Sequence, residues 1–216
     1  MNNLVIDKKS VIVLGSGGHA KVLIEMLWRS GISIIGVVSP NENNKKFMGV
    51  EVLGGDEVID DYSENEVMLV NGLGSLPGKM NRWLLANKFR QKGFHFMTVV
   101  DSHAVVARDV LMGEGVQVMA GTVIQPNVEI GMDTIINTHS SIDHDCKIEH
   151  NCHLAPGVTV CGGVRIGNNV HISTGTSIIQ GVSIGSNSTI TAGSVVVKDV
   201  DEGVIINQYK EMYEKF

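Results

Sequence analysis

His144 and Asp145 stand side by side in the part of the chain richest in histidine. The sequence has eight histidines, and five of them lie between residues 139 and 171. An imidazole beside a carboxylate is what a general base needs, because the carboxylate fixes the tautomer of the ring and stabilises its protonated form. The pair predicts proton transfer, and a solvated histidine with an accidental acidic neighbour is the alternative.

A second candidate site is a glycine-rich turn that reads Gly15-Ser16-Gly17-Gly18-His19-Ala20. It follows an apolar strand expected at 11–14 and opens an amphipathic helix expected at 19–30, the context in which the G-x-G-x-x-G/A spacing has a mechanism. Glycines let backbone amides approach a phosphate, and the helix N-terminus adds its own N–H groups and dipole. The candidate phosphate-binding residues are Gly15, Gly17, Gly18 and His19.

Two qualifications apply to this turn. A side chain at Gly17 would fill the space that phosphate oxygens need, and Gly17 could also require a φ that is forbidden to other residues. A glycine-rich turn with no ligand is the alternative. The next strand, expected at 32–38, is followed by Ser39-Pro40-Asn41 and not by the acid that grips a nicotinamide ribose, which argues against a dinucleotide dehydrogenase.

The element that must position His144 is a repeat of six residues. Every sixth residue from Val100 to Val196 is apolar, for seventeen consecutive hexads without an insertion. Four residues after each comes a small or β-branched residue, in a series from Ala104 to Val200. Two inward positions per hexad, with turn formers between them, predict very short strands that turn a corner each hexad and stack as parallel rungs of a solenoid.

The same register places the chemical residues. His144 and Asp145 fall between the inward positions Ile142 and Cys146, so their side chains project at or near a corner of the coil. Cys146 and Cys152 occupy the small inward slot, which predicts packing rather than redox or metal chemistry. Three cysteines without a CxxC pair do not form a disulfide framework.

The first ninety or so residues follow a different pattern, in which strands alternate with helices. Further strands are expected at 50–53 and 67–70, and a second helix at 79–92 that carries Trp83, Leu84, Leu85 and Phe89. This alternation predicts a small parallel sheet packed by helices, a Rossmann-like α/β domain. We therefore expect a Rossmann-like domain at 1–97 and a solenoid domain with a short C-terminal tail at 98–216.

Composition excludes some functional classes. The formal net charge of −6 and pI near 5.7 give no electrostatic reason to expect nucleic acid or an acidic membrane surface as a partner. No stretch approaches the length of a membrane span, and the first ten residues lack the apolar run of a signal peptide. A cytoplasmic location is the expectation.

Taken together, the hexads, the segments VIVLGSGGHAKV and EVLGGDEVI, and the run NTHSSIDHDCKI resemble the sugar O-acyltransferase and sialic-acid O-acetyltransferase-like family. Its best-understood relatives are bacterial nucleotide-activated 4-amino-sugar N-acetyltransferases. The resemblance implies a left-handed parallel β-helix with about three hexads per coil and a homotrimer with active sites at subunit interfaces. It also implies a nucleotide-sugar substrate bound by the Rossmann-like domain and acetyl-CoA along the groove between neighbouring helices.

The resemblance assigns roles to single residues. The family's base matches His144, and the acid that orients it matches Asp145, where relatives often have Glu. A second histidine, beside the acetyl group, matches His153, and the backbone amide that polarises the thioester carbonyl matches Gly162. Asn137 matches an asparagine on the sugar side.

The chain departs from the family at two places. Relatives usually carry Asp at the end of the second strand to contact the base of the nucleotide, where this chain has Ser39-Pro40-Asn41. The family also commonly closes the helix with a Gly-x-Pro-Ala segment near the adenine of CoA, which residues 204–216 lack. The identity of the nucleotide base and the contacts of the adenine are therefore unassigned.

The expected reaction is acetyl transfer from acetyl-CoA to the amine of a nucleotide-linked sugar, such as a 4-amino-4,6-dideoxy sugar, for surface glycan synthesis, with no metal. O-acetylation of a sugar hydroxyl is the nearest alternative. Two other classes stay open: a hexapeptide-type zinc enzyme such as a γ-type carbonic anhydrase, suggested by the spacing of His139 and His144, and a noncatalytic nucleotide-sugar-binding protein.

Overall fold

The computed structural model describes residues 10–40 and 45–207. The described residues form two compact units. One contains the chain up to Ser75 together with Met80–Val99, and the other contains Leu76–Lys79 and the chain from Val100 onward. Neither α-helix in the described residues has the length and apolar content that a membrane span requires.

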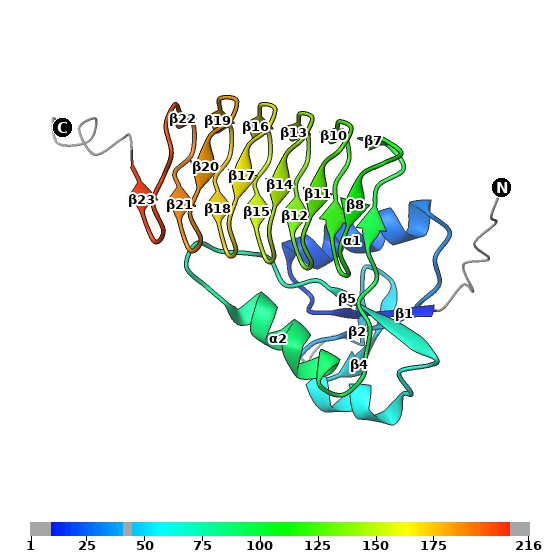
Figure 1. Ribbon diagram of the computed structural model, residues 1–216. Helices are drawn as coiled ribbons and strands as arrows, with labels where there is room; N and C mark the ends of the chain where they lie inside the picture. The colour runs from blue at the N-terminus through cyan, green and yellow to red at the C-terminus, as the bar shows by residue number, and fades with distance from the viewer. Residues whose placement is uncertain (1–9, 41–44, 208–216) are drawn as a thin grey trace, which may run out of the picture. The chain divides into compact units, whose positions relative to one another are not determined.

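The first unit is a five-stranded sheet in the order β3-β4-β2-β1-β5 (Figure 1). All its neighbours pair in parallel except β3 and β4. The strands are β1 (Ser10–Leu14), β2 (Ile34–Val38), β3 (Lys46–Phe47), β4 (Val50–Gly54) and β5 (Val67–Asn71). The helices are α1 (Gly18–Arg29), the 3-10 helix η1 (Asp56–Asp61) and α2 (Asn81–Arg90).

Helices α1 and α2 cover opposite faces of this sheet (Figure 1). On the α2 face, Ile12 and Leu14 of β1 pack with Ala86 and Phe89 in one buried cluster. The helix expected at 79–92 is two residues too long at each end. The apolar pattern of this helix also gave a wrong expectation, because Leu84 is 62% exposed whereas Arg82 is buried.

The second unit is a parallel β-helix with three faces, each a stack of two-residue strands (Figure 1). The first face contains β7 (Val105–Val106), β10 (Val123–Ile124), β13 (Ser141–Ile142), β16 (Thr159–Val160), β19 (Ser177–Ile178) and β22 (Val195–Val196). The second contains β8 (Leu111–Met112), β11 (Glu129–Ile130), β14 (Lys147–Ile148), β17 (Arg165–Ile166) and β20 (Ser183–Ile184). The third contains β6 (Val99–Val100), β9 (Gln117–Val118), β12 (Ile135–Ile136), β15 (His153–Leu154), β18 (His171–Ile172), β21 (Thr189–Ile190) and β23 (Ile205–Ile206).

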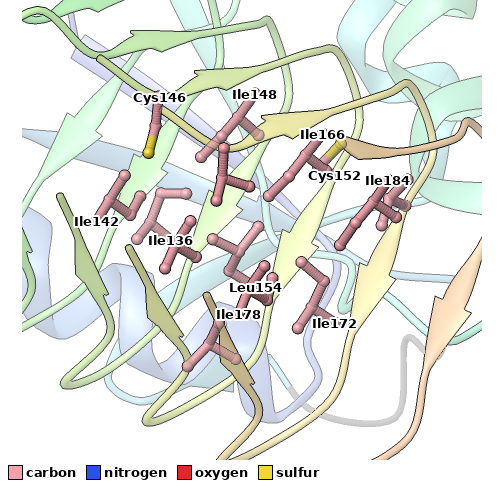
Figure 2. Packing of buried hydrophobic residues seen from close by; sticks show 14 of the residues in the cluster. Ile136, Ile142, Cys146, Ile148, Cys152, Leu154, Ile166, Ile172, Ile178 and Ile184 are labelled. Carbon is pink, nitrogen blue, oxygen red and sulfur yellow. The ribbon is translucent and has the colours of Figure 1, made fainter. Parts of the chain in front are cut away.

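Each coil before the last described one is eighteen residues long, so rung partners such as Ile124 and Ile142 are three hexads apart. The two inward positions of each hexad fill one continuous core (Figure 2). The predicted inward positions are confirmed from Val116 to Val196, and Cys146 and Cys152 lie in that core at 1% exposure each. Burial raises the pKa of the Cys152 thiol to about 12, which agrees with the packing role expected of it.

The corners explain which residues stand between the inward positions. Every sixth residue from Gly115 to Gly193 has φ between 54° and 72°, the left-handed region that favours glycine and tolerates Asn and Asp. These positions are occupied by Gly, Asn, Asp and one His, and they include Asp145 at φ 62°. The sequence therefore turns each corner with residues suited to it.

Two parts of the predicted register are wrong. At the start, Val100 is 37% exposed and Val106 and Met112 are only half-buried, because the core closes fully from Val116 onward. At the end, Val200 was expected in the small inward slot, but it forms a bridge with Ile184 sixteen residues earlier. The last described coil is thus two residues shorter, and Val200 takes the place of a large aliphatic residue.

Candidate functional site

His144 and Asp145 lie together at the corner between β13 and β14. The His144 Nδ1 atom is 2.7 Å from Asp145 Oδ2, and the Asn127 amide Nδ2, one coil earlier, donates to Asp145 Oδ1 at 2.6 Å. Both side chains of the pair are more than half exposed. Because Nδ1 is bonded to Asp145, the imidazole Nε2 is the atom that can accept a proton.

The electrostatics of this pair suit a base. The hydrogen bond that His144 donates to Asp145 is the main cause that raises the pKa of His144, and the charge of Asp143 raises it further. The bond from Asn127 is the main cause that lowers the pKa of Asp145, followed by the bond with His144. Asp145 therefore stays ionised and supports the protonated form of His144.

Gly162 lies one coil beyond His144 at the same corner. A Cβ atom on Gly162 would lie 2.8 Å from His144 Cε1 and 2.9 Å from Nε2, so only glycine leaves room for the ring in its present position. The neighbouring Gly163 N–H donates to the His144 carbonyl. Within residues 10–40 and 45–207 the Gly162 N–H has no hydrogen-bond acceptor, and an amide in that state can stabilise an oxyanion.

A shallow groove of about 230 Å³ runs along the face that leads into this corner. It is lined in part by Asp143, Thr159 and Cys161, the residues just before His144 and Gly162. The groove therefore ends beside the His144 corner, at Asp143 and Cys161.

Asn137 and His153 meet at a different place, on the face made by β12 and β15. The Thr138 N–H donates to Asn137 Oδ1 at 2.8 Å, which turns Nδ2 toward His153 Nε2 at 3.2 Å. Since an amide NH₂ can only donate, His153 Nε2 acts as the acceptor of this bond. Within one chain, Asn137 and His153 therefore form a pair away from the corner that carries His144.

Sequence reasoning missed His171 at this second position. The rings of His153 and His171 are rung partners with centroids 4.8 Å apart at 83°, an edge-to-face contact. Burial lowers the pKa of His171, which favours its neutral form. The signal was available, because residues eighteen positions apart stack in this repeat.

His139 lies at yet another corner, between β12 and β13, where it packs against Gly121. In the single chain His139 and His144 are thus at successive corners rather than side by side. The described residues contain no group of three or more His, Cys, Asp or Glu side chains arranged to hold a metal ion.

The glycine-rich turn joins β1 to α1. Gly15 has φ 98°, and a Cβ there would lie 2.9 Å from the Leu73 side chain. Gly17 and Gly18 are exposed with open space beside them, and His19 follows half-buried in the first turn of α1. The expectation of a forbidden φ at Gly17 is wrong: its φ is −89°, and Gly15 is the residue that needs the left-handed conformation.

The end of β2 approaches this turn. Ser39 Oγ and Ser16 Oγ are 2.7 Å apart, and the Gly15 N–H donates to the Val38 carbonyl. The hydroxyls of Ser16 and Ser39 therefore lie at the end of β2, where a dinucleotide-binding domain would have an acidic residue. Asn41, named with Ser39 and Pro40 above, and residues 208–216 of the C-terminal segment lie outside the described residues.

Two family models match the chain. The PglD N-terminal domain matches residues 10–89, and the bacterial transferase hexapeptide model, six repeats long, matches residues 109–144.

Solved structures match both parts together. A variant of perosamine N-acetyltransferase from Caulobacter crescentus, in complex with CoA and GDP-perosamine, has 35% identity, with 91% of this chain and 92% of that one covered and a TM-score of 0.84. The acetyltransferase domain of PglB from Neisseria gonorrhoeae, in complex with acetyl coenzyme A, has 27% identity, with 91% and 95% covered and a TM-score of 0.83. WeeI from Acinetobacter baumannii shares the fold at 22% identity, with 93% and 97% covered and a TM-score of 0.83. The expected left-handed β-helix with a Rossmann-like domain is confirmed.

Proposed function

The chain belongs to the hexapeptide-repeat family of nucleotide-activated sugar acyltransferases, and from this premise we propose that it transfers the acetyl group of acetyl-CoA to the amine of a nucleotide-linked amino sugar. The observation that carries the proposal is the His144–Asp145 pair packed against Gly162. It provides a base and an adjacent amide donor on a scaffold shared over nine-tenths of the chain with an amino-sugar N-acetyltransferase.

In the proposed mechanism His144 accepts the proton that the amine loses as its nitrogen attacks the thioester carbonyl. A C–N bond forms, the carbonyl becomes a tetrahedral oxyanion, and the C–S bond then breaks to release the CoA thiol with a proton. Asp145 stabilises the imidazolium. The Gly162 N–H donates to the oxyanion, so the enzyme needs no covalent nucleophile of its own.

The thioester side of the site also involves His153, whose Nε2 accepts a hydrogen bond from Asn137. These two residues and His144 occupy different faces of one β-helix. We propose that the protein is a homotrimer in which the corner of one subunit meets the Asn137–His153 face of its neighbour. Asn137 then acts through His153 in addition to any contact with the sugar.

The N-terminal unit is proposed to bind the nucleotide-linked sugar. The open space at Gly17 and Gly18, at the start of α1, suits a diphosphate. Ser16 and Ser39 stand at the carboxyl ends of adjacent strands, near where a nucleotide would lie in an open α/β sheet. A cytoplasmic location stays a prediction from the sequence.

The activity test supplies acetyl-CoA with GDP-, UDP- or dTDP-linked 4-amino-4,6-dideoxy sugars and measures release of free thiol, with mass spectrometry of the product. Thiol release with an alkali-stable acetamide on the sugar supports the proposal. An alkali-labile ester would instead show O-acetylation. No release with any of these sugars, in a protein that binds both ligands, would contradict it.

The assembly test is analytical ultracentrifugation. A trimer is expected, and mixing a His144→Ala chain with a His153→Ala chain should restore part of the activity, because some interfaces then combine the intact residues of each. A fully active monomer would contradict the interface site.

A further inference from the structure

Asn71, the last residue of β5, and the loop that follows it face the glycine-rich turn. We call residues 71–74 the 71–74 loop. In the sheet order β1 lies between β2 and β5, so the connections after β1 and β5 leave the sheet in opposite directions, as at the ligand-binding edge of doubly wound sheets. The Gly72 N–H donates to the Leu14 carbonyl at 2.8 Å. A Cβ on Gly72 would lie 2.7 Å from that carbonyl oxygen, so loop and turn are in close contact.

Arg82, the second residue of α2, hydrogen-bonds to this loop. It is 3% exposed, and its Nη1 atom donates to the carbonyls of Asn71 at 2.7 Å and Leu73 at 2.8 Å. In return, Asn71 Nδ2 donates to the Arg82 carbonyl and Asn71 Oδ1 accepts from the Leu73 N–H. A guanidinium keeps its charge when buried, so this position is costly unless such bonds stabilise it.

The geometry of the loop gives Arg82 a consequence for binding. All described peptide bonds are trans, and in a trans peptide the N–H points opposite to the preceding carbonyl. Because the Leu73 carbonyl points to Arg82, the Gly74 N–H points away from it. Within the described parts of the chain that N–H has no hydrogen-bond acceptor.

Gly74 also lies next to the start of α1. A Cβ on Gly74 would be 3.8 Å from the His19 Cβ, in ordinary contact. The amides of Gly17 and Gly18 are likewise without acceptors among the described residues. The loop therefore adds a backbone donor beside the turn where a phosphate is proposed to bind.

We propose that Arg82 is a positioning residue for the nucleotide-linked substrate, because its guanidinium fixes the 71–74 loop so that the Gly74 amide and the turn amides together bind the diphosphate. The inference rests on the proposed function of the N-terminal unit. It adds a buried cation and a backbone donor that the glycine motif does not contain.

The experiment titrates the full-length protein with UDP, GDP, dTDP and CDP by calorimetry, and with acetyl-CoA as the internal reference. For the diphosphate that binds most tightly, Arg82→Met should raise Kd by about 10-fold or more, since two charge-assisted bonds to the loop are lost. Arg82→Lys should have a smaller effect. The Kd for acetyl-CoA should stay within about twofold, because the β-helix is a separate unit.

Two controls separate positioning from stability. Phe89→Leu, a core change on the same helix, should lower the Tm but leave the diphosphate Kd unchanged. Gly74→Pro removes the N–H whereas Gly74→Ala keeps it, so only the proline variant should weaken diphosphate binding. If Arg82→Met does not fold, this pair of variants tests whether the Gly74 amide binds the diphosphate.

Four outcomes overturn the inference. Wild-type diphosphate affinity in Arg82→Met, or equal affinity in the two Gly74 variants, removes it while the proposed function stands. Equal loss of diphosphate and acetyl-CoA binding in Arg82→Met makes Arg82 a purely structural residue. If the wild-type protein binds none of the four diphosphates, the nucleotide role of the N-terminal unit fails, and the inference with it.

Discussion

Replacing Gly162 by alanine tests the central contact of the site. The new Cβ would lie 2.8 Å from His144 Cε1. Carbon atoms pack at about 3.5 Å or more, so the imidazole must move by about 0.7 Å. The ring is 61% exposed and can swing outward without disturbing the core, so the Tm should change little.

The catalytic effect should be larger than the structural one. A displacement of about 1 Å can cost about 100-fold in rate, so we expect kcat for acetyl transfer to fall by about 10- to 100-fold. Moving the ring also weakens its bond with Asp145, the main cause of the raised pKa of His144. A base works only when deprotonated, so a lower pKa of His144 should shift the acidic limb of the pH–rate profile to lower pH.

The assay is steady-state thiol release as a function of pH, with Gly163→Ala as the matched control. Gly163 has φ 68° and open space around it, so alanine there costs about 1–2 kcal/mol of backbone strain and touches nothing. The control should lower the Tm and keep kcat. Full kcat with an unmoved pH profile in Gly162→Ala would refute the proposed role of this contact.

Three further predictions follow from the same structure. His144→Ala should lower kcat by about 100- to 10,000-fold, and Asp145→Asn should lower it less, because asparagine also tolerates the left-handed corner. Steady-state kinetics and circular dichroism check both variants, and unchanged turnover in the alanine variant would assign the general base to another residue. Gly17→Val should fold normally, since its φ is −89°, but should raise KM for the nucleotide-linked sugar and not for acetyl-CoA; an equal rise in both would contradict the division of labour between the units. Asn169→Ala should reduce the free energy of unfolding by about 1–2 kcal/mol in a urea titration, because alanine is strained at φ 59° and cannot make the side-chain bonds to Asn151 and Asn187. Asn169→Gly should lose less stability, because glycine is not strained there. Equal losses in the two variants would rule out the strain argument.

The β-helix could be predicted in detail because its physics is local. A hexad needs one large and one small inward residue and a corner residue that tolerates positive φ, and each requirement leaves its own mark on the sequence. The prediction failed where that locality ends. At Val100 there is no earlier coil to complete the burial, and after Val196 a coil shortened by two residues puts Val200 in another slot.

Part of the candidate site could also be predicted from the sequence. Adjacency in sequence was enough to pair His144 with Asp145, and the eighteen-residue period would have paired His153 with His171. Arg82 could not be found, because a charged residue in a helix is expected at the surface. Its burial depends on two carbonyls of a loop that precedes it in the chain, and no periodicity encodes that contact.

The uniform coil length has a consequence for how such a chain can diverge. Removing residues 164–181, one whole coil, would leave the contacts of His144 with Asp145 and Gly162 and the bond of Asn127 to Asp145 in place. Everything after them would move closer by about 4.8 Å. An indel of six or twelve residues would move every later strand to another face, and one that is not a multiple of six would break the hexad register. The distance from the base to the far end of the β-helix therefore changes in fixed increments. The coil after Val196 can be two residues shorter because only β23 follows it among the described strands.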